Sequence, residues 1–169
     1  MDLEELERLY AAHAAALHAY LLNLLRDEAD ARDAFQAVFQ QLQARPDLAG
    51  ARDERGFLLR LAHSRAIDAL RRQGVRRKAE EMAGQESSLN PFAPAADPDE
   101  GLFRIRLSEA LAGLPPEQRA VVHLKLWEGM TFDRIAALLD IPLNTAASRY
   151  RYGLDKLRGL LRPLYDEIR

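Results

Sequence analysis

The sequence predicts an all-α protein with two small helical domains joined by a linker. Apolar residues recur at helical spacing along most of the chain, and no segment shows the alternation of a half-buried strand. Residues 84–101 (GQESSLNPFAPAADPDEG) interrupt this pattern with three prolines and two glycines. The chain has 169 residues and is 48% hydrophobic, which is enough for two small cores.

The distribution of charge divides the chain at the same places. Residues 1–78 contain 13 Lys/Arg and 12 Asp/Glu, residues 79–101 contain no Lys/Arg and 6 Asp/Glu, and residues 102–169 contain 11 and 8. We therefore expect domains at 1–78 and 102–169 and an acidic, proline-rich linker at 79–101. Because the net charge is −2, any affinity for nucleic acid must belong to a local surface.

Composition also limits the compartment and the chemistry. No run approaches the roughly 20 apolar residues that cross a bilayer, and the N-terminal MDLEELERLY is too acidic for a signal or transit peptide. Without cysteine there is no disulfide and no thiolate metal site. We expect a cytoplasmic protein that does not insert into membranes.

The first domain is predicted to consist of helices that follow one another along the chain. Residues 3–25 form an amphipathic helix whose inner face carries Leu6, Leu9, Tyr10, Leu17, Leu21 and Leu24. A second helix over residues 27–43 has an inner face of Ala34, Phe35, Val38, Phe39 and Leu42.

A polar break containing Pro46 and Gly50 precedes the third helix. This helix covers residues 55–72, and its predicted inner residues are Phe57, Leu58, Leu61, Ala62, Ile67 and Leu70. It is expected to end in a basic cluster of Arg71, Arg72, Arg76, Arg77 and Lys78.

The second domain begins with a helix near residues 102–111, and Pro115-Pro116 starts another. Thr131 is a suitable N-cap for a short helix with the apolar stripe Ile135, Ala136, Leu138 and Leu139. Asp140-Ile141-Pro142 ends that helix, because aspartate tolerates a tight turn and proline disrupts helical hydrogen bonding. The next helix covers about residues 143–161, with Leu154, Leu157 and Leu161 inward.

A short helix, a tight turn and a longer helix form a helix-turn-helix arrangement. The first two turns of the longer helix are predicted to expose groups suited to base edges and phosphates, namely Asn144, Thr145, Ser148, Arg149 and Arg151. These residues are the candidate duplex-DNA contacts.

Several motifs in both domains match one known family. In the first domain these are DARD (30–33), Gln36, Val38, Phe39, FLLRLA (57–62) and AIDALRR (66–72). In the second they are LPPEQR (114–119), EGMT (128–131), Ile135-Ala136, Thr145 and Ser148-Arg149. In this order the motifs resemble regions two and four of the small bacterial sigma factors of the extracytoplasmic-function (ECF) group, in the sigma-70 family. The resemblance covers about residues 3–78 and 103–162.

The resemblance implies a subunit that binds core RNA polymerase and promoter DNA and directs transcription initiation, without catalysis or a cofactor of its own. It implies polymerase contacts at Asp30, Asp33, Gln36, Phe39 and Gln40. It implies contacts with the melted minus-ten element at Arg60, Ser64, Arg65, Arg71 and Arg72, with residues 45–60 helping to hold an unstacked base. The helix-turn-helix would read the minus-thirty-five element. An anti-sigma protein is the kind of regulator that the resemblance implies.

The chain departs from the family pattern at four places. Ala37 stands where an acid usually follows the glutamine, Ser64 replaces an asparagine, and Phe57 replaces a tryptophan. Ala146-Ala147 replaces a Val-Lys pair, which removes one DNA contact of about 1 kcal/mol or more.

Two other functions remain open at this level. One is a dimeric helix-turn-helix repressor or activator, although no symmetric dimer interface is evident in the first domain. The other is a sigma-like adaptor or decoy that binds polymerase or an anti-sigma protein without initiating transcription, which Ala37 and Ala146-Ala147 keep open. The four histidines show no metal-binding spacing, and no catalytic motif is evident, so we expect neither a metal site nor an enzyme.

Overall fold

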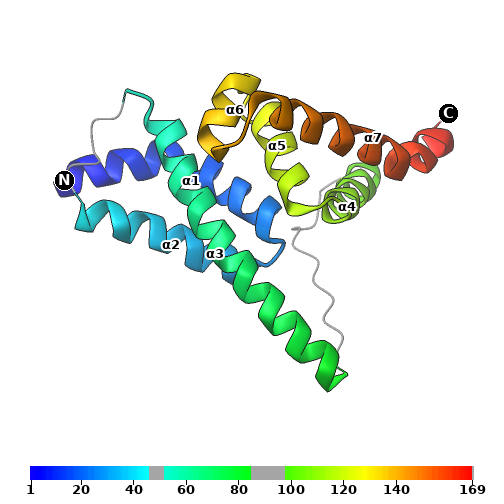
Figure 1. The fold of residues 1–169 in the computed structure, drawn as a ribbon, viewed down its shortest axis with the longest axis horizontal. Coiled ribbons are helices and arrows are strands. Elements are labelled where there is room, and N and C mark those ends of the chain that lie inside the picture. The colour runs from blue at the N-terminus through cyan, green and yellow to red at the C-terminus, as the bar shows by residue number, and fades with distance from the viewer. Residues whose placement is uncertain (46–51, 85–97, 169) are drawn as a thin grey trace. The chain divides into compact units, whose positions relative to one another are not determined.

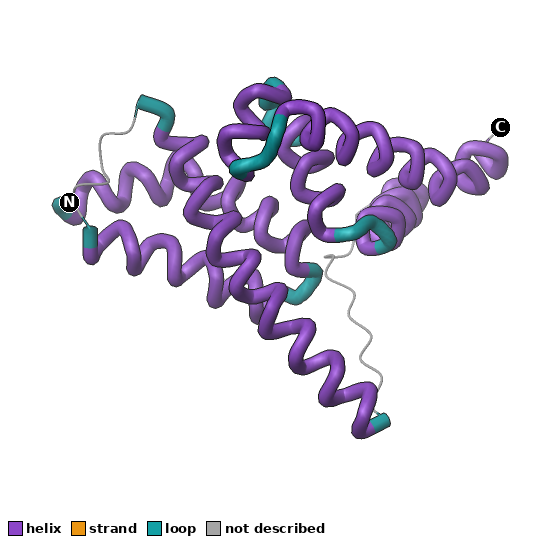
Figure 2. The backbone as a smooth tube through the Cα atoms, in the orientation of Figure 1, coloured by secondary structure: helices purple, strands orange, loops and turns teal. Residues whose placement is uncertain are grey.

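The computed structural model describes residues 1–45, 52–84 and 98–168. In these ranges the chain is helical and contains no strand, as the sequence predicts (Figures 1 and 2). The helices are α1 (Leu3–Leu25), α2 (Glu28–Ala44), α3 (Glu54–Ala83), α4 (Pro98–Ala112), α5 (Pro116–Leu126), α6 (Phe132–Leu139) and α7 (Leu143–Ile168). They belong to two compact units, Met1–Leu89 and Asn90–Arg169.

Each helix of the first unit starts at an aspartate that caps it. Asp2, Asp27 and Asp53 accept hydrogen bonds from the backbone N–H groups of Glu5, Asp30 and Gly56, at 2.8, 2.8 and 3.0 Å. Such a cap satisfies one of the N–H groups that the first turn leaves unpaired, and it contributes about 1 kcal/mol.

The core of the first unit lies where α1, α2 and α3 meet. The fully buried side chains include Leu17, Tyr20, Leu21, Val38, Leu42, Leu58 and Leu59. The prediction was wrong for Tyr10, whose side chain is 52% exposed although it follows the buried Leu9. On α3, Phe57, Leu61, Ile67 and Leu70 are only half-buried, whereas Leu59, Ala66 and Ala69 are buried. The reason is that α3 packs against both α1 and α2, and its small alanines allow this close approach.

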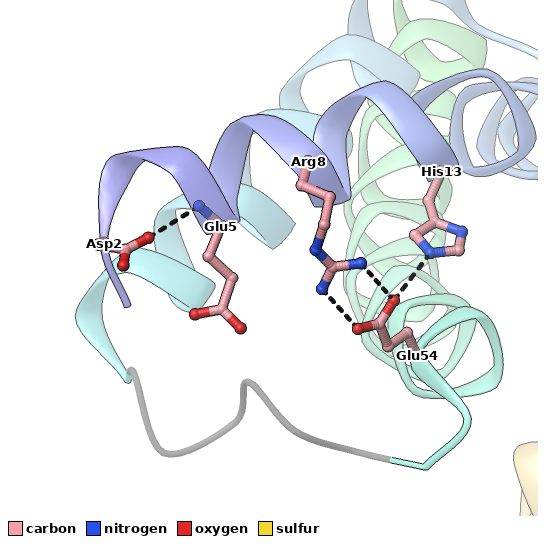
Figure 3. A network of polar contacts seen from close by, with 5 residues as sticks. All are labelled: Asp2, Glu5, Arg8, His13 and Glu54. Atoms are coloured by element: carbon pink, nitrogen blue, oxygen red, sulfur yellow. Dashed lines mark hydrogen bonds and ion pairs between the residues drawn. The ribbon is translucent and has the colours of Figure 1, made fainter.

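An ion-pair network joins the start of α3 to α1 (Figure 3). The Arg8 guanidinium donates two hydrogen bonds to the Glu54 carboxylate, at 3.0 and 2.6 Å, and His13 Nε2 lies 3.5 Å from the same carboxylate. The hydrogen bond from Arg8 lowers the pKa of Glu54, and the partner carboxylate raises the pKa of Arg8. This bidentate contact fixes the first turn of α3 against α1.

The third predicted helix is longer than expected. It was predicted to end near Arg72, but α3 continues to Ala83 and stops at Gly84, whose φ of 72° is left-handed. Gly74 does not interrupt it. The basic cluster therefore lies within the second half of α3, a helix that extends beyond α1 and α2 (Figure 1). Of the segment expected to be the linker, residues 79–83 lie in α3 and residues 98–101 lie in α4, and residues 85–97 lie outside the described ranges. The expectation that residues 98–101 cannot be helical was therefore wrong.

The second unit has its own core where α4, α5 and α7 meet. Its buried residues are Ala110, Leu111, Leu114, Val122 and Leu157, with Leu107, Tyr150, Leu154 and Leu161 packed against them. The predicted inner residues of the last helix, Leu154, Leu157 and Leu161, are thus confirmed. That helix continues past residue 161 to Ile168, with Pro163 inside it. None of the described helices is both long and apolar enough to span a membrane.

Candidate polymerase and DNA interfaces

The helix-turn-helix of α6 and α7 is built by its caps and its turn. The Thr131 hydroxyl accepts from the Arg134 backbone N–H at 3.3 Å, and Asp140 ends α6 with a left-handed φ of 54°. The Ile141 N–H then donates to the Ala136 carbonyl at 3.0 Å, and α7 begins directly after Pro142. The predicted N-cap and the predicted turn at Asp140 are both confirmed.

Close packing against α5 sets the position of α7. A Cβ added at Gly153 would lie 2.8 Å from Val122 Cγ2, so only glycine permits this approach. Ala146, one of the two alanines that depart from the family pattern, is fully buried on the same side. Its small side chain therefore belongs to the core. Of the two alanines, Ala147 is the one that stands in place of the lysine of the family pattern.

The predicted DNA face of α7 is exposed unevenly. Asn144 and Arg151 are exposed, whereas Thr145, Ser148 and Arg149 are half-buried. Asn144, Ser148 and Arg151 lie three or four residues apart and therefore share a face opposite Ala146. Thr145 and Arg149 lie along one flank of that face. The five residues therefore form a continuous polar surface over two turns, the length that a major groove accommodates.

A buried histidine lies beneath the turn between α5 and α6. His123 is 2% exposed, and its ring stacks on that of Trp127 at 5.3 Å with an interplanar angle of 12°. Burial lowers the pKa of His123 to about 4. The imidazole is therefore neutral at physiological pH and acts as part of the core.

The predicted minus-ten residues do not all lie on one face of α3. Arg60, Ser64 and Arg71 are exposed and share the face that points away from α1 and α2. Arg65 points toward α2 instead and donates a hydrogen bond to the Gln41 side-chain oxygen. Arg72 is exposed on the same flank as Arg65. The outer face also carries the half-buried Phe57 and Ile67, so it combines cations with apolar surface, as single-stranded DNA requires. Residues 46–51, part of the segment expected to hold an unstacked base, lie outside the described ranges.

One residue beside this face was assigned no role from the sequence. His63 Nδ1 lies 2.8 Å from the hydroxyl of Tyr20, which is fully buried. Burial raises the pKa of Tyr20, so the hydroxyl keeps its proton and can donate it to Nδ1. A bond between residues 43 positions apart leaves no local sequence signal, which is why spacing could not reveal it.

The predicted polymerase residues on α2 also differ in whether they face solvent or contact another helix. Asp33, Gln36 and Gln40 are exposed, and Phe39 is half-buried beside them. Asp30 contacts α3 instead: its carboxylate accepts hydrogen bonds from Gln73, at 2.8 Å, and from Arg76, and its side chain is 15% exposed. The predicted polymerase residues that face outward are therefore two amides, one carboxylate and a half-buried ring. Among the residues that the structure describes, no cluster of three or more His, Asp or Glu side chains could hold a metal ion.

Comparisons with known proteins agree with this arrangement. The family described as "Sigma-70 region 2" matches residues 9–76, and the family described as "Sigma-70, region 4" matches residues 104–157. The chain is 33% identical over 163 residues to the RNA polymerase sigma factor CarQ of Myxococcus xanthus, covering 96% of this chain and 92% of CarQ. It is 33% identical over 161 residues to the ECF RNA polymerase sigma factor SigL of Mycobacterium tuberculosis, covering 92% of this chain and 88% of SigL.

The fold also matches a solved structure, that of the sigma factor RpoE in complex with the anti-sigma factor NepR from Bartonella quintana. The TM-score is 0.80 at 20% sequence identity, over 95% of this chain and 98% of that one. The two sigma-70 regions occur in order, one on each helical unit, and the relatives match over most of their length. These findings show the family. The chain belongs to the sigma-70 family as an ECF sigma factor, a subunit that binds core RNA polymerase and directs it to promoter DNA.

Proposed function

We propose that the two units divide promoter recognition between them. In this proposal residues 1–78 bind core polymerase and the melted minus-ten element, residues 79–101 connect the two regions, and residues 102–169 bind the minus-thirty-five duplex. The observation that carries the proposal is that each matched sigma-70 region coincides with a unit that exposes a polar or basic helix face.

In the first unit, the outward residues of α2 are the polymerase contacts. This surface consists of Asp33, Gln36, Phe39 and Gln40. Asp30 holds α2 against α3 through its hydrogen bonds with Gln73 and Arg76. On α3, Arg60, Ser64 and Arg71 bind the single strand that opens at the minus-ten element. Arg65, which is held by Gln41, has mainly a structural role, and Arg72 contributes positive charge at the edge.

In the second unit, α7 enters the major groove with Asn144, Thr145, Ser148, Arg149 and Arg151. The guanidinium of Arg151 lies 5.1 Å from the ring centre of Tyr152, which limits its motion. Arg151 is one turn beyond Ala147 and supplies a cation close to the one that the alanine lacks.

The protein acts in the cytoplasm, where polymerase and promoters are, and the polymerase supplies the chemistry. An anti-sigma protein is the regulator we infer, because the structurally similar RpoE was crystallised with the anti-sigma factor NepR.

In-vitro transcription tests the proposed function. Purified protein added to core RNA polymerase should produce discrete transcripts from a pooled promoter library, and Arg149→Ala should remove them. Polymerase binding without transcripts would favour the decoy function. Protection of a palindromic DNA site in the absence of polymerase would favour a dimeric regulator.

A further inference from the structure

A buried hydrogen bond lies beside the DNA-binding face of α3. The hydroxyl of Tyr20 on α1 and Nδ1 of His63 on α3 are 2.8 Å apart, and the centres of the two rings are 6.3 Å apart. Tyr20 is fully buried, so its hydroxyl has to be paired within the fold. His63 is half-buried, which means that part of its side chain reaches the surface. The histidine therefore connects the core of the first unit to the surface of α3.

The Tyr20 hydroxyl selects one tautomer of the His63 imidazole. Burial raises the pKa of Tyr20, so the phenol keeps its proton and donates it to Nδ1. A neutral imidazole has one N–H donor and one acceptor, and an acceptor at Nδ1 leaves the proton on Nε2. The two ring nitrogens point in different directions, so the Nε2–H group is directed away from Tyr20.

The neighbours of His63 on α3 are residues of the face assigned to the melted strand. Arg60 lies one turn before it, Ile67 lies one turn after it, and the exposed Ser64 follows it directly. Arg60 offers a positive charge to a phosphate, and Ile67 offers apolar surface to the flat side of a base. An N–H group that is held in one orientation suits the remaining part of a nucleotide, the hydrogen-bonding edge of the base.

We propose that His63 reads one base of the melted minus-ten strand, with Nε2–H donating a hydrogen bond to a ring nitrogen or carbonyl oxygen on the edge of that base. Tyr20 is the positioning residue, because it acts through Nδ1 of His63. A fixed donor favours bases with an acceptor at this place and opposes bases with an amino group there, so His63 is a specificity-determining residue. A phosphate contact would not distinguish one base from another. This inference rests on the proposed binding of the melted strand by α3.

Two amide substitutions separate the roles of the two nitrogens. In His63→Asn the side-chain oxygen takes the place of Nδ1 and can still accept from Tyr20, whereas the Nε2–H group is lost. In His63→Gln the amide N–H takes the place of Nε2–H instead. The pair therefore distinguishes a residue that only supports Tyr20 from one that donates to DNA.

The test is a titration of RNA polymerase holoenzyme, made with each variant, with a fluorescent single-stranded oligonucleotide. The oligonucleotide carries the non-template minus-ten sequence of a promoter found by in-vitro transcription. His63→Asn should raise the dissociation constant about three- to tenfold, as loss of one hydrogen bond does, and His63→Gln should keep most of the affinity. If His63→Asn binds as tightly as the wild type, the proposal is overturned.

Oligonucleotides with one abasic position at a time show whether a base is read. At one position the abasic site should weaken the wild type about three- to tenfold more than it weakens His63→Asn, because the variant has already lost that contact. At the other positions the two proteins should lose affinity by the same factor. Equal factors at every position would overturn the proposal, because His63 would then contact only the backbone of the strand or none of it.

Nitrogen NMR of the full-length protein tests the role of Tyr20. Long-range ¹H–¹⁵N spectra at about pH 8, where an ordinary imidazole is neutral, should show the His63 proton on Nε2, with the signals assigned by their loss in His63→Asn. Tyr20→Phe should populate both tautomers and weaken oligonucleotide binding less than His63→Asn does. A proton on Nδ1 in the wild type would overturn the proposal.

The controls separate this inference from the function on which it rests. Unfolding curves on the same samples establish that each variant is folded. If wild-type holoenzyme does not bind the oligonucleotide at all, the proposed function of α3 fails, and this inference fails with it. If the wild type binds and Arg71→Ala weakens binding while His63→Asn does not, only the inference about His63 fails.

Discussion

Asp30 occupies a position that the family resemblance assigns to polymerase contact, and its carboxylate is used inside the first unit. It accepts hydrogen bonds from Gln73 and Arg76, while Gln73 also donates to the Leu25 carbonyl at 3.0 Å. The sequence showed an acid at the right spacing, but spacing along α2 cannot show that α3 passes close enough to bind it. A residue can thus match the family motif while its side chain makes contacts within its own domain.

Replacing Asp30 should therefore affect the stability of the first unit more than it affects polymerase binding. Asp30→Ala should lower the free energy of unfolding of the first unit by about 1–3 kcal/mol, because Gln73 and Arg76 lose a charged acceptor. The control Asp33→Ala, one turn along α2 and exposed, should change it by less than about 0.5 kcal/mol. Hydrogen exchange of the α2 and α3 amides measures this unit separately. Unchanged exchange in Asp30→Ala, together with weaker polymerase binding, would contradict the assignment.

His123 makes the stability of the second unit depend on pH. Its pKa is about 4 in the fold and about 6.5 when unfolded, so the unfolded state binds the proton more tightly. The stabilisation is fully present above pH 6.5, and up to about 3 kcal/mol is lost as the pH falls toward 4.

The single tryptophan, Trp127, stacks on His123 and reports unfolding of this unit by fluorescence. Denaturant titrations at pH 7 and pH 4.5 should show a smaller loss of stability at low pH in His123→Phe than in the wild type. Equal losses in the two proteins would mean that other groups cause the pH dependence.

The helix boundaries show which local sequence signals are enough to predict where a helix starts or ends. Starts were predicted well where a capping residue is present, as at Thr131, because the cap hydrogen bond is local. The ends of α1 and α2 were predicted to within one residue, whereas α3 passes Arg72 and Gly74 and stops only at Gly84. A glycine inside a helix costs about 1 kcal/mol, which neighbouring turns can offset at Gly74. The left-handed conformation of Gly84 is what ends α3.

Two glycines of α7 provide a matched test of how this helix is placed. Gly153→Ala should destabilise the second unit by about 1–3 kcal/mol, since the new Cβ would lie 2.8 Å from Val122 Cγ2. Gly159→Ala in the same helix meets nothing within 4 Å and should be neutral or stabilise by up to about 1 kcal/mol. Trp127 fluorescence in denaturant measures both variants. If Gly153→Ala were as stable as Gly159→Ala, close packing of α7 on α5 would not be what holds the DNA-reading helix.

For the molecule as a whole, helical periodicity and the distribution of charge and proline predicted two helical domains and an acidic connection between them. The order of motifs then predicted the family, which the matched regions and the full-length relatives confirm. What composition and motifs could not provide is which face each side chain occupies: Arg65 and Asp30 turn inward, and Tyr10 turns outward. Those orientations depend on contacts between helices that are far apart in the sequence.

Permanganate footprinting of thymines on one promoter tests whether promoter recognition is divided between the two units. With wild-type protein and core polymerase, thymines in the minus-ten region should become reactive, and the minus-thirty-five duplex should be protected from nuclease. Arg71→Ala should reduce the reactivity and leave the protection. Arg149→Ala should remove the protection and, with it, the reactivity. If Arg71→Ala removed the minus-thirty-five protection, or Arg149→Ala left it intact, the division of recognition between the units would be contradicted.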